Sequence, residues 1–533
     1  MKLIQHHLHT TLNRLLAAVF AVILVAGCQQ SDSIEVYKDY KKPTPGTEPE
    51  RSDAVYKALS AIHGVSEVTI QKNTGSERCG YYFYVDQYVD NSDPTKGTFK
   101  QLCLLEYEKP EAPVVLWTDG YALGDTIENI PYPDVATHLE ANVLHVEHRY
   151  FGHSLPEPIE DVDFTYFYAS QAAADLHRVV TLMKQHFFTK GNKWVSAGSS
   201  KSGITTTLYA YYSDLNGWDD IDLYMPFCAP FLVGTPEQPF DKSPDTYMIE
   251  SCGAGYPKDS EEYKAFCSLK AYPSAIANNK RLRETCLKLY HLSNPDDYIT
   301  LINAYPNEVE KACTVGIIHD FYDNLFDDFV HICFSDWAGM VPDPSALKED
   351  SPQEDYDKVA AFIFSKSDNI EKLVSEKNDN TRAGYTPEQI IEFRKKNADM
   401  PYSIQAYREL GLRDCYFGLV TGDYITPEYC EQVYQQHLND QRPYEGLYHG
   451  QWDGGKLMKS VRQWVNTTRK NIFFVYGSND PWSGGAIEVM EGHPTVTLLN
   501  VPGGRHTPDI FNEKAYHPDY AKIITQALDK YAK

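Results

Sequence analysis

The sequence predicts an α/β fold in which a doubly wound, mostly parallel sheet is interrupted by a large helical insertion. Short apolar runs alternate with segments of helical periodicity up to about residue 235, and the alternation resumes at about residue 471. The stretch at 231–463 lacks it and is rich in Tyr, Asp, Glu and Lys. Buried apolar strands that alternate with helices are typical of parallel sheets covered on both faces.

The first 27 residues have the pattern of a bacterial lipoprotein signal peptide. Lys2 and Arg14 accompany an apolar run at 15–25 that is too short to span a bilayer as a permanent helix. The run ends in LVAGC, which resembles the lipobox, where cleavage precedes the cysteine and the thiol of Cys28 carries the lipid. The alternative is an ordinary secretory signal with a chance cysteine.

Residues 28–52 are rich in Pro, Glu and Lys and are expected to form a tether. We therefore expect an exported protein anchored to the bacterial cell envelope, at the outer membrane or cell surface.

The remaining chain is long and apolar enough for a substantial core. Its length exceeds one ordinary domain, and the whole sequence is 42% apolar with 39 Tyr and 23 Phe. A net charge of −25 argues against a nucleic-acid partner. Such a field suits a cationic or ammonium-bearing substrate, although acidic surfaces usually serve solubility.

The elements follow in order along two parts of a core, 53–230 and 464–533. In the first part we expect strands at 114–118, 142–146, 193–197 and 221–226, with helices at 165–188 and 204–212. The insertion at 231–463 includes a helical window at 387–397. In the second part we expect strands at 471–476 and 495–500 and a helix at 518–531.

Ten cysteines remain besides Cys28, and an even number in an exported chain suggests disulfides. Cys79 and Cys103 flank a hairpin-like stretch at 81–101 whose turn reads NSDP, so a disulfide between them is expected. The alternative is buried free thiols that behave as small hydrophobic residues. No CxxC pair occurs, so the sequence does not indicate a zinc ribbon.

A glycine- and serine-rich turn, GSSKSG, starts at Gly198 and follows the strand at 193–197. A nucleophile elbow needs small residues two positions before and two after the nucleophile, because strand and helix pass closely there. Ser200 meets this requirement through Gly198 and Ser202, whereas Ser199 or Ser202 as nucleophile would place a bulky side chain at one of these positions. Ser200 is therefore the expected nucleophile; the alternative is a turn without a catalytic role.

Two later turns supply an acid and a histidine. The strand at 471–476 runs into GSNDPW, which contains Asp480, and the last strand is followed by PGGRH, which ends in His506. The order Ser, Asp, His is that of the α/β-hydrolase fold. We expect His506 to take the proton of Ser200 and return it to the leaving group, while Asp480 holds the imidazole tautomer.

An oxyanion hole needs two preorganised donors. One is expected to be the backbone N–H of Lys201, and the other to come from Gly120 or Tyr121 in the loop after an earlier strand. The side chain of Lys201 is expected to be a solvated or helix-start group rather than a catalyst.

The segment EHRYFGHSLP, which begins at Glu147, resembles the EHRYYGxSxP segment of the prolyl carboxypeptidase and dipeptidyl peptidase II group. The elbow, acid and histidine segments occur in the same order as in that group. The lysine after the serine and the lipoprotein setting are more similar to the related bacterial prolyl tri- and tetrapeptidyl aminopeptidases. The resemblance covers most of the chain from about residue 75, as islands. It implies a serine exopeptidase that cleaves after proline, with the insertion covering the site. Ser202 departs from the usual glycine, and the insertion matches weakly, which leaves substrate preference open.

Glu147 and Arg149 lie at the carboxyl end of a predicted strand, where ligands bind in such sheets. They either shape the substrate site or form a buried structural ion pair. His145 and His148 lack a third ligand at suitable spacing, so we expect no metal. The expected chemistry needs no cofactor.

Three function classes are consistent with these observations. A post-proline exopeptidase acting on peptides is favoured. An esterase or another small-substrate α/β-hydrolase would use the same triad. A catalytically silent binding lipoprotein would keep the fold but lose the triad, whose residues are intact here. The sequence does not determine the oligomeric state or the number of residues released per cut.

Overall fold

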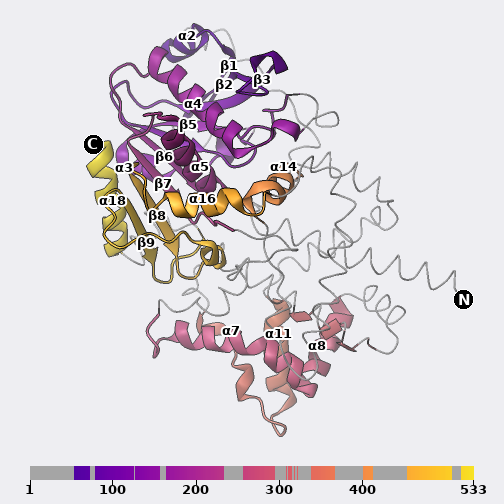
Figure 1. The fold of residues 1–533 in the computed structure, drawn as a ribbon. Coiled ribbons are helices and arrows are strands. Elements are labelled where there is room, and N and C mark those ends of the chain that lie inside the picture. Colours follow the sequence, from indigo (N-terminus) through magenta and orange to yellow (C-terminus); the bar gives the residue numbers. More distant parts are fainter. Residues whose placement is uncertain are drawn as a thin grey trace, which may run out of the picture.

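One mixed sheet organises the molecule in the computed structural model (Figure 1). The structure describes residues 53–72, 78–124, 126–156, 164–232, 256–293, single positions between 308 and 321, 338–365, 400–411, 453–506 and 518–533. Within this part of the chain the sheet has nine strands in the order β1-β2-β3-β5-β4-β6-β7-β8-β9. The strands are β1 (Val65–Lys72), β2 (Cys79–Tyr88), β3 (Thr98–Glu106), β4 (Val114–Thr118), β5 (Asn142–Val146), β6 (Trp194–Ser199), β7 (Leu223–Phe227), β8 (Ile472–Gly477) and β9 (Val496–Val501).

The sheet is mostly parallel, as predicted. β1, β2 and β3 pair antiparallel with their neighbours, and β3 also pairs antiparallel with β5. From β5 through β4, β6, β7 and β8 to β9 every pairing is parallel. β5, β7 and β8 are buried along their whole length. Their sequences are largely apolar because neither face of these strands meets solvent, and Asn142 and His145 in β5 are buried polar exceptions.

Helices cover both faces of the sheet. α4, α5 and α16 contribute Leu176, Leu208 and Val461 to the core on one face. α3 and α18 contribute Val135 and Ile524 to the core on the other. The two helical layers and the sheet form the predicted α/β-hydrolase fold. These helices and the N-terminal one are α2 (Ala54–Ser60), α3 (Asp134–Leu139), α4 (Ala169–His186), α5 (Lys201–Asn216), α16 (Lys456–Trp464) and α18 (Pro518–Ala532).

The described parts of the insertion are helical. In α7, the ring of Tyr272 lies 5.0 Å from that of Phe321 and 5.6 Å from that of Phe362 in α11. The π-helix packs on the core, where Arg408 donates a 2.6 Å hydrogen bond to the carbonyl of Phe164. The elements are α7 (Glu261–Asn278), α8 (Lys280–Ser293), α11 (Gln353–Ser365), α14 (Met400–Gln405) and the π-helix η9 (Ala406–Leu410). The window at 387–397 lies outside the described residues, and the boundaries of the insertion remain predictions.

Short 3-10 helices complete the described secondary structure. They are η3 (Pro94–Lys96), η4 (Ile127–Asn129), η5 (Phe164–Tyr166), η7 (Ala338–Met340), η8 (Pro344–Ala346) and η12 (Pro481–Gly485).

The hairpin of β2 and β3 is present. The prediction of a disulfide between Cys79 and Cys103 is wrong, because both are free cysteines. Cys103 lies opposite Phe83 in the ladder. Cys79 precedes Gly80, which lies opposite Glu106. The ladder register therefore separates the two sulfurs, and Cys103 is a buried free thiol.

The predicted signal peptide, Cys28 and the tether at 28–52 lie outside the described residues. Among the helices that the structure does describe, none combines the length and the apolar character that a membrane span requires.

Candidate active site

Ser200 forms the apex of the turn between β6 and α5. Its backbone angles are φ 57° and ψ −122°, a positive-φ conformation that residues with a side chain rarely adopt. The backbone N–H of Ser200 donates to the carbonyl of Phe227 at the end of β7 (2.9 Å). Strain of this kind, held by neighbouring strands, is typical of a nucleophile elbow.

Small residues make this turn feasible. A Cβ at Gly198 would lie 2.6 Å from the backbone carbonyl of Ser202, and one at Gly203 would lie 2.7 Å from the carbonyl oxygen of Phe227. Ser202, where the usual elbow has glycine, is accommodated because its hydroxyl accepts a 2.9 Å hydrogen bond from the N–H of Gly120.

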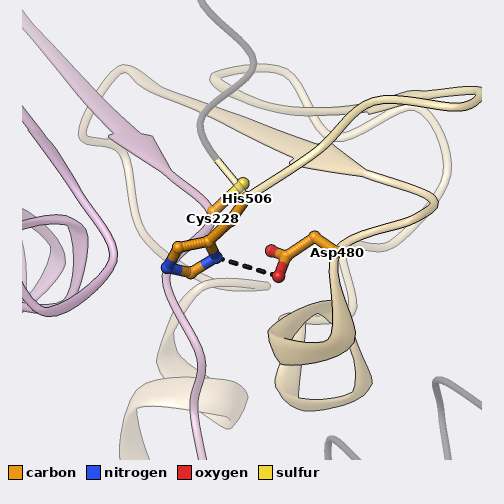
Figure 2. A group of neighbouring side chains, drawn as sticks. All are labelled: Cys228, Asp480 and His506. Atoms are coloured by element: carbon orange, nitrogen blue, oxygen red, sulfur yellow. Dashed lines mark hydrogen bonds and ion pairs between the residues drawn. The ribbon is translucent and has the colours of Figure 1, made fainter. Parts of the chain in front are cut away.

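Asp480 and His506 lie together at the ends of β8 and β9 (Figure 2). Nδ1 of His506 donates to Oδ1 of Asp480 at 2.8 Å, and the side chains are 5% and 0% exposed. Asp480 also accepts from the N–H of Trp482 (2.9 Å) and the hydroxyl of Ser483 (3.2 Å). These donors fix the carboxylate, which in turn keeps the Nδ1 proton on the imidazole and leaves Nε2 as the basic nitrogen. Trp482 is buried, with its ring 6.4 Å from that of His506.

The loops that carry this pair are joined to each other by backbone hydrogen bonds. The N–H of Ser478 donates to the carbonyl of Val501 and that of Asn479 to the carbonyl of Gly504, both at 2.9 Å. The N–H of Gly503 donates to the hydroxyl of Ser478 at 2.6 Å. The distance between Asp480 and His506 is therefore set by the main chain rather than by two mobile side chains.

Cys228 is a member of this group that the sequence did not reveal. It directly follows β7, has a φ of 45° and is fully buried. Its Sγ donates to the carbonyl of Arg505 at 3.7 Å, and one ligand atom each of Cys228, Asp480 and His506 lie within 4.8 Å of one another (Figure 2). Burial, reinforced by the charge of Asp480, raises the pKa of the thiol to about 12. The thiol is therefore protonated at neutral pH and does not compete with Ser200 as a nucleophile. Its position two residues after the strand predicted at 221–226 was the available sequence signal.

The predicted oxyanion loop lies directly on the elbow. The N–H of Gly120 is engaged by the hydroxyl of Ser202, so the expectation that Gly120 donates to an oxyanion is wrong. Tyr121 remains the candidate donor of this loop, together with the backbone N–H of Lys201.

Lys201 is the first residue of α5, so the helix-start alternative is confirmed, whereas the solvated alternative is wrong because the residue is only 2% exposed. Its ammonium donates to the carbonyl of Gly120 and lies 5.3 Å and 5.0 Å from the ring centroids of Tyr121 and Phe151. A carbonyl and two ring faces replace the water that the charge loses on burial. Lys201 and Ser202 therefore hold Gly120 by its carbonyl and its N–H, respectively.

Arg149 holds together segments of the core that are distant in the sequence. It is fully buried and forms a bidentate pair with Asp175 at 2.6 and 2.8 Å. Its remaining N–H groups donate to the carbonyls of Tyr88, Val89 and Tyr166. Arg149 therefore does form a buried ion pair, but its partner is Asp175 and not Glu147.

Glu147 is likewise turned toward the protein interior. Its carboxylate accepts from the N–H groups of Leu123 and His153 and from the hydroxyl of Ser154 at 2.6–2.9 Å. It is fully buried, and burial raises its pKa to about 7 despite these donors. Its role is to hold the loop that follows β5, where a Cβ at Gly152 would come within 2.1 Å of Oε1.

The chain is similar to several known proteins. Residues 47–241, which include the elbow, match the family described as PS-10 peptidase S37. The chain is 26% identical over 440 residues to a prolyl tri/tetrapeptidyl aminopeptidase of Streptomyces mobaraensis, covering 81% of this chain and 76% of that one. It is 26% identical over 505 residues to a serine protease, vicPb, of Bipolaris victoriae, covering 83% and 86% of the two chains. A cell-wall-degrading esterase from Xanthomonas oryzae matches 88% of this chain and 100% of its own at a TM-score of 0.33 and 10% identity. The chain is a serine hydrolase that is similar to the S37 peptidases.

Proposed function

We propose that this chain is a serine exopeptidase that removes short N-terminal peptides, three or four residues long, after proline. The observation that carries the proposal is the buried Asp480–His506 hydrogen bond of 2.8 Å at the sheet edge where Ser200 occupies its strained turn. The similarity to the prolyl tri/tetrapeptidyl aminopeptidase supports the specificity.

The reaction follows from the roles of the three side chains. Ser200 Oγ attacks the scissile carbonyl while Nε2 of His506 takes its proton, and Asp480 stabilises the imidazolium that forms. The N–H groups of Lys201 and Tyr121 hold the oxyanion. His506 then protonates the departing amine, and the acyl-enzyme is hydrolysed by a water that His506 deprotonates.

An aminopeptidase must also recognise a free ammonium at a fixed distance from Ser200. An extended tripeptide reaches only about 10 Å, so the counter-charge lies close to the site. Carboxylates of the insertion are the natural partners in a chain with 74 acidic residues. The proline ring is rigid and has no N–H to satisfy, which calls for a tight apolar pocket before the scissile bond.

Chromogenic peptides test this specificity. We expect Ala-Ala-Pro-p-nitroanilide to be cleaved with release of the tripeptide. Acetylating its N-terminus is expected to lower kcat/KM by at least about 30-fold, because one partner of a charge pair is lost. Replacing proline with alanine should also weaken cleavage. Equal cleavage of blocked and free peptides would show an endopeptidase or carboxypeptidase instead. Turnover of short esters without any peptide cleavage would favour the esterase alternative.

We further propose that the mature chain is anchored to the bacterial envelope through a lipid on Cys28. The support is the LVAGC sequence and the polar tether after it. Cys28→Ser is expected to leave the protein unlipidated, which intact-mass analysis and detergent partitioning detect. A lipid-free mature protein that begins downstream of Cys28 would contradict the anchor.

A further inference from the structure

The thiol beside the His506–Asp480 pair has no role in the hydrolysis described above. We propose that Cys228, His506 and Asp480 form a binding site for a thiophilic divalent cation such as Zn²⁺, and that a bound cation switches the hydrolase off.

The three side chains form a ligand set that zinc favours. Thiolate, imidazole and carboxylate all occur in protein zinc sites, and a water would complete four-fold coordination. In a tetrahedral site with bonds of about 2.0–2.3 Å, neighbouring ligand atoms lie about 3.3–3.8 Å apart. The ligand atoms already lie within 4.8 Å of one another (Figure 2), so small side-chain rotations close the site. Among the described residues no other group of three such side chains comes as close.

The backbone holds these ligands in place without a cation. They come from the ends of three adjacent parallel strands, β7, β8 and β9. Cys228 is tied to β8 by the 2.8 Å bond from its N–H to the carbonyl of Val475. Its thiol contacts the carbonyl of Arg505, the residue before His506. A site that is held in advance loses little conformational entropy when a cation binds.

Cation binding prevents catalysis. Catalysis needs a hydrogen on Nδ1 of His506, and the cation takes the place of that hydrogen. A cation on Nδ1 displaces the proton now donated to Asp480, and that proton moves to Nε2. The Cys228 thiol releases its proton to solvent as the sulfur–metal bond forms. Nε2 then carries a hydrogen and cannot accept the proton of Ser200. No electron is transferred, and removing the cation restores the original tautomer.

Cobalt reports the site without relying on activity. Co²⁺ added to the full-length protein is expected to give a thiolate-to-cobalt charge-transfer absorption in the near ultraviolet. Cys228→Ser should lose this absorption, whereas Cys286→Ser, which removes another buried free thiol in α8, should keep it. Cys228→Ala provides a second variant, and circular dichroism establishes that each variant is folded. An unchanged absorption in both Cys228 variants would overturn the site.

Fluorophosphonate labelling of Ser200 tests the inhibition without depending on peptide specificity. We expect Zn²⁺ to slow labelling at least tenfold in the wild type and in Cys286→Ser, and less than twofold in Cys228→Ser, each relative to its own metal-free rate. Chelation should restore the rate, and Mg²⁺, which prefers oxygen ligands, should have no effect. Equal slowing by Zn²⁺ in Cys228→Ser would overturn the proposal. A metal-free wild type that does not label would instead count against Ser200 as the nucleophile.

Discussion

Ser200 combines a strained backbone with a position at the edge where parallel strands end. Its positive φ is held by the hydrogen bond to Phe227 and by the two glycines that flank it. The turn thus presents its hydroxyl in one orientation.

Ser200→Ala is expected to fold normally and to lose nearly all turnover. Removing one member of a triad costs several orders of magnitude in kcat, because the members act as a unit. The measurements are kcat on a chromogenic peptide, fluorophosphonate labelling and the thermal midpoint. Retention of activity within about tenfold would refute the assignment of Ser200.

Lys201 acts through its contact with Gly120 rather than on the substrate. In Lys201→Met the ammonium that holds the Gly120 carbonyl is lost while most of the apolar bulk remains. We expect kcat to fall about tenfold with little change in KM, because loss of a complete oxyanion donor costs about 100- to 1,000-fold and here a donor is only displaced.

The matched control is Lys270→Met in α7. Lys270 is exposed and also lies over an aromatic ring, that of Phe266 at 5.5 Å, but far along the chain from the elbow. Its kinetics should equal those of the wild type. An unchanged kcat in Lys201→Met would show that the oxyanion loop is positioned without the lysine.

Individual residues differed in how well the sequence predicted them. Gly198, Ser200 and His506 stand in local patterns whose steric and chemical requirements can be read directly. Cys228 and Lys201 could not be assigned, because their surroundings come from strands and loops distant in the chain. Lys201 is buried by the rings of Phe151 and Tyr121, and no local sequence pattern predicts its contact with these rings.

At the scale of elements, the turns after β8 and β9 behave as one unit. A Cβ at Gly477 would lie 2.2 Å from the carbonyl oxygen of Gly504 and 2.4 Å from that of Arg505. Both contacts are with backbone, so no side chain can move aside to relieve them.

Gly477→Ala is therefore expected to push the His506 loop away from Asp480. The predicted loss of stability is about 1–3 kcal/mol, as for other overpacked sites, together with at least a tenfold loss of kcat. Urea unfolding and steady-state kinetics measure the two effects. Gly339→Ala, whose added Cβ meets nothing within 4 Å, is the control. Wild-type kinetics in Gly477→Ala would show that the loops adapt independently.

The core elements were predictable because their periodicity is complete within short windows. The strands expected at 114–118 and 142–146 match β4 and β5, and the others are displaced by one or two residues. The pairing of Cys79 with Cys103 failed because it depends on strand register, which cysteine spacing does not determine. The antiparallel arrangement of β1, β2 and β3 likewise depends on which strands pair, and this is not determined within a short window of sequence.

At the scale of the whole molecule, buried carboxyl groups lie within a strongly acidic chain. Burial raises the pKa of Glu409 to about 7, although its carboxylate accepts a 2.5 Å hydrogen bond from the N–H of Ala169. Burial likewise raises the pKa of Glu147 to about 7. Between pH 4.5 and 7 the folded protein holds protons that the unfolded chain has released. The free energy of unfolding therefore falls as pH rises through this window.

Glu409→Gln is expected to reduce this dependence. The amide oxygen of glutamine can still accept from Ala169, and the side chain stays neutral at every pH. The difference in unfolding free energy between pH 5 and pH 8 should shrink by about 2–3 kcal/mol. Glu261→Gln, at an exposed position of α7, should leave the difference unchanged. Urea titrations at both pH values make the comparison, and an undiminished difference in Glu409→Gln would assign the pH dependence elsewhere.

The sheet brings together a serine and its partners from distant parts of the chain. Asp480 is translated about 280 residues after Ser200, and β8 and β9 must dock beside β7 before His506 reaches its place. A nascent or truncated polypeptide that ends within the insertion therefore carries the nucleophile without a base. The chain is therefore inert while it is being synthesised, and hydrolytic activity arises only when the last strands complete the sheet.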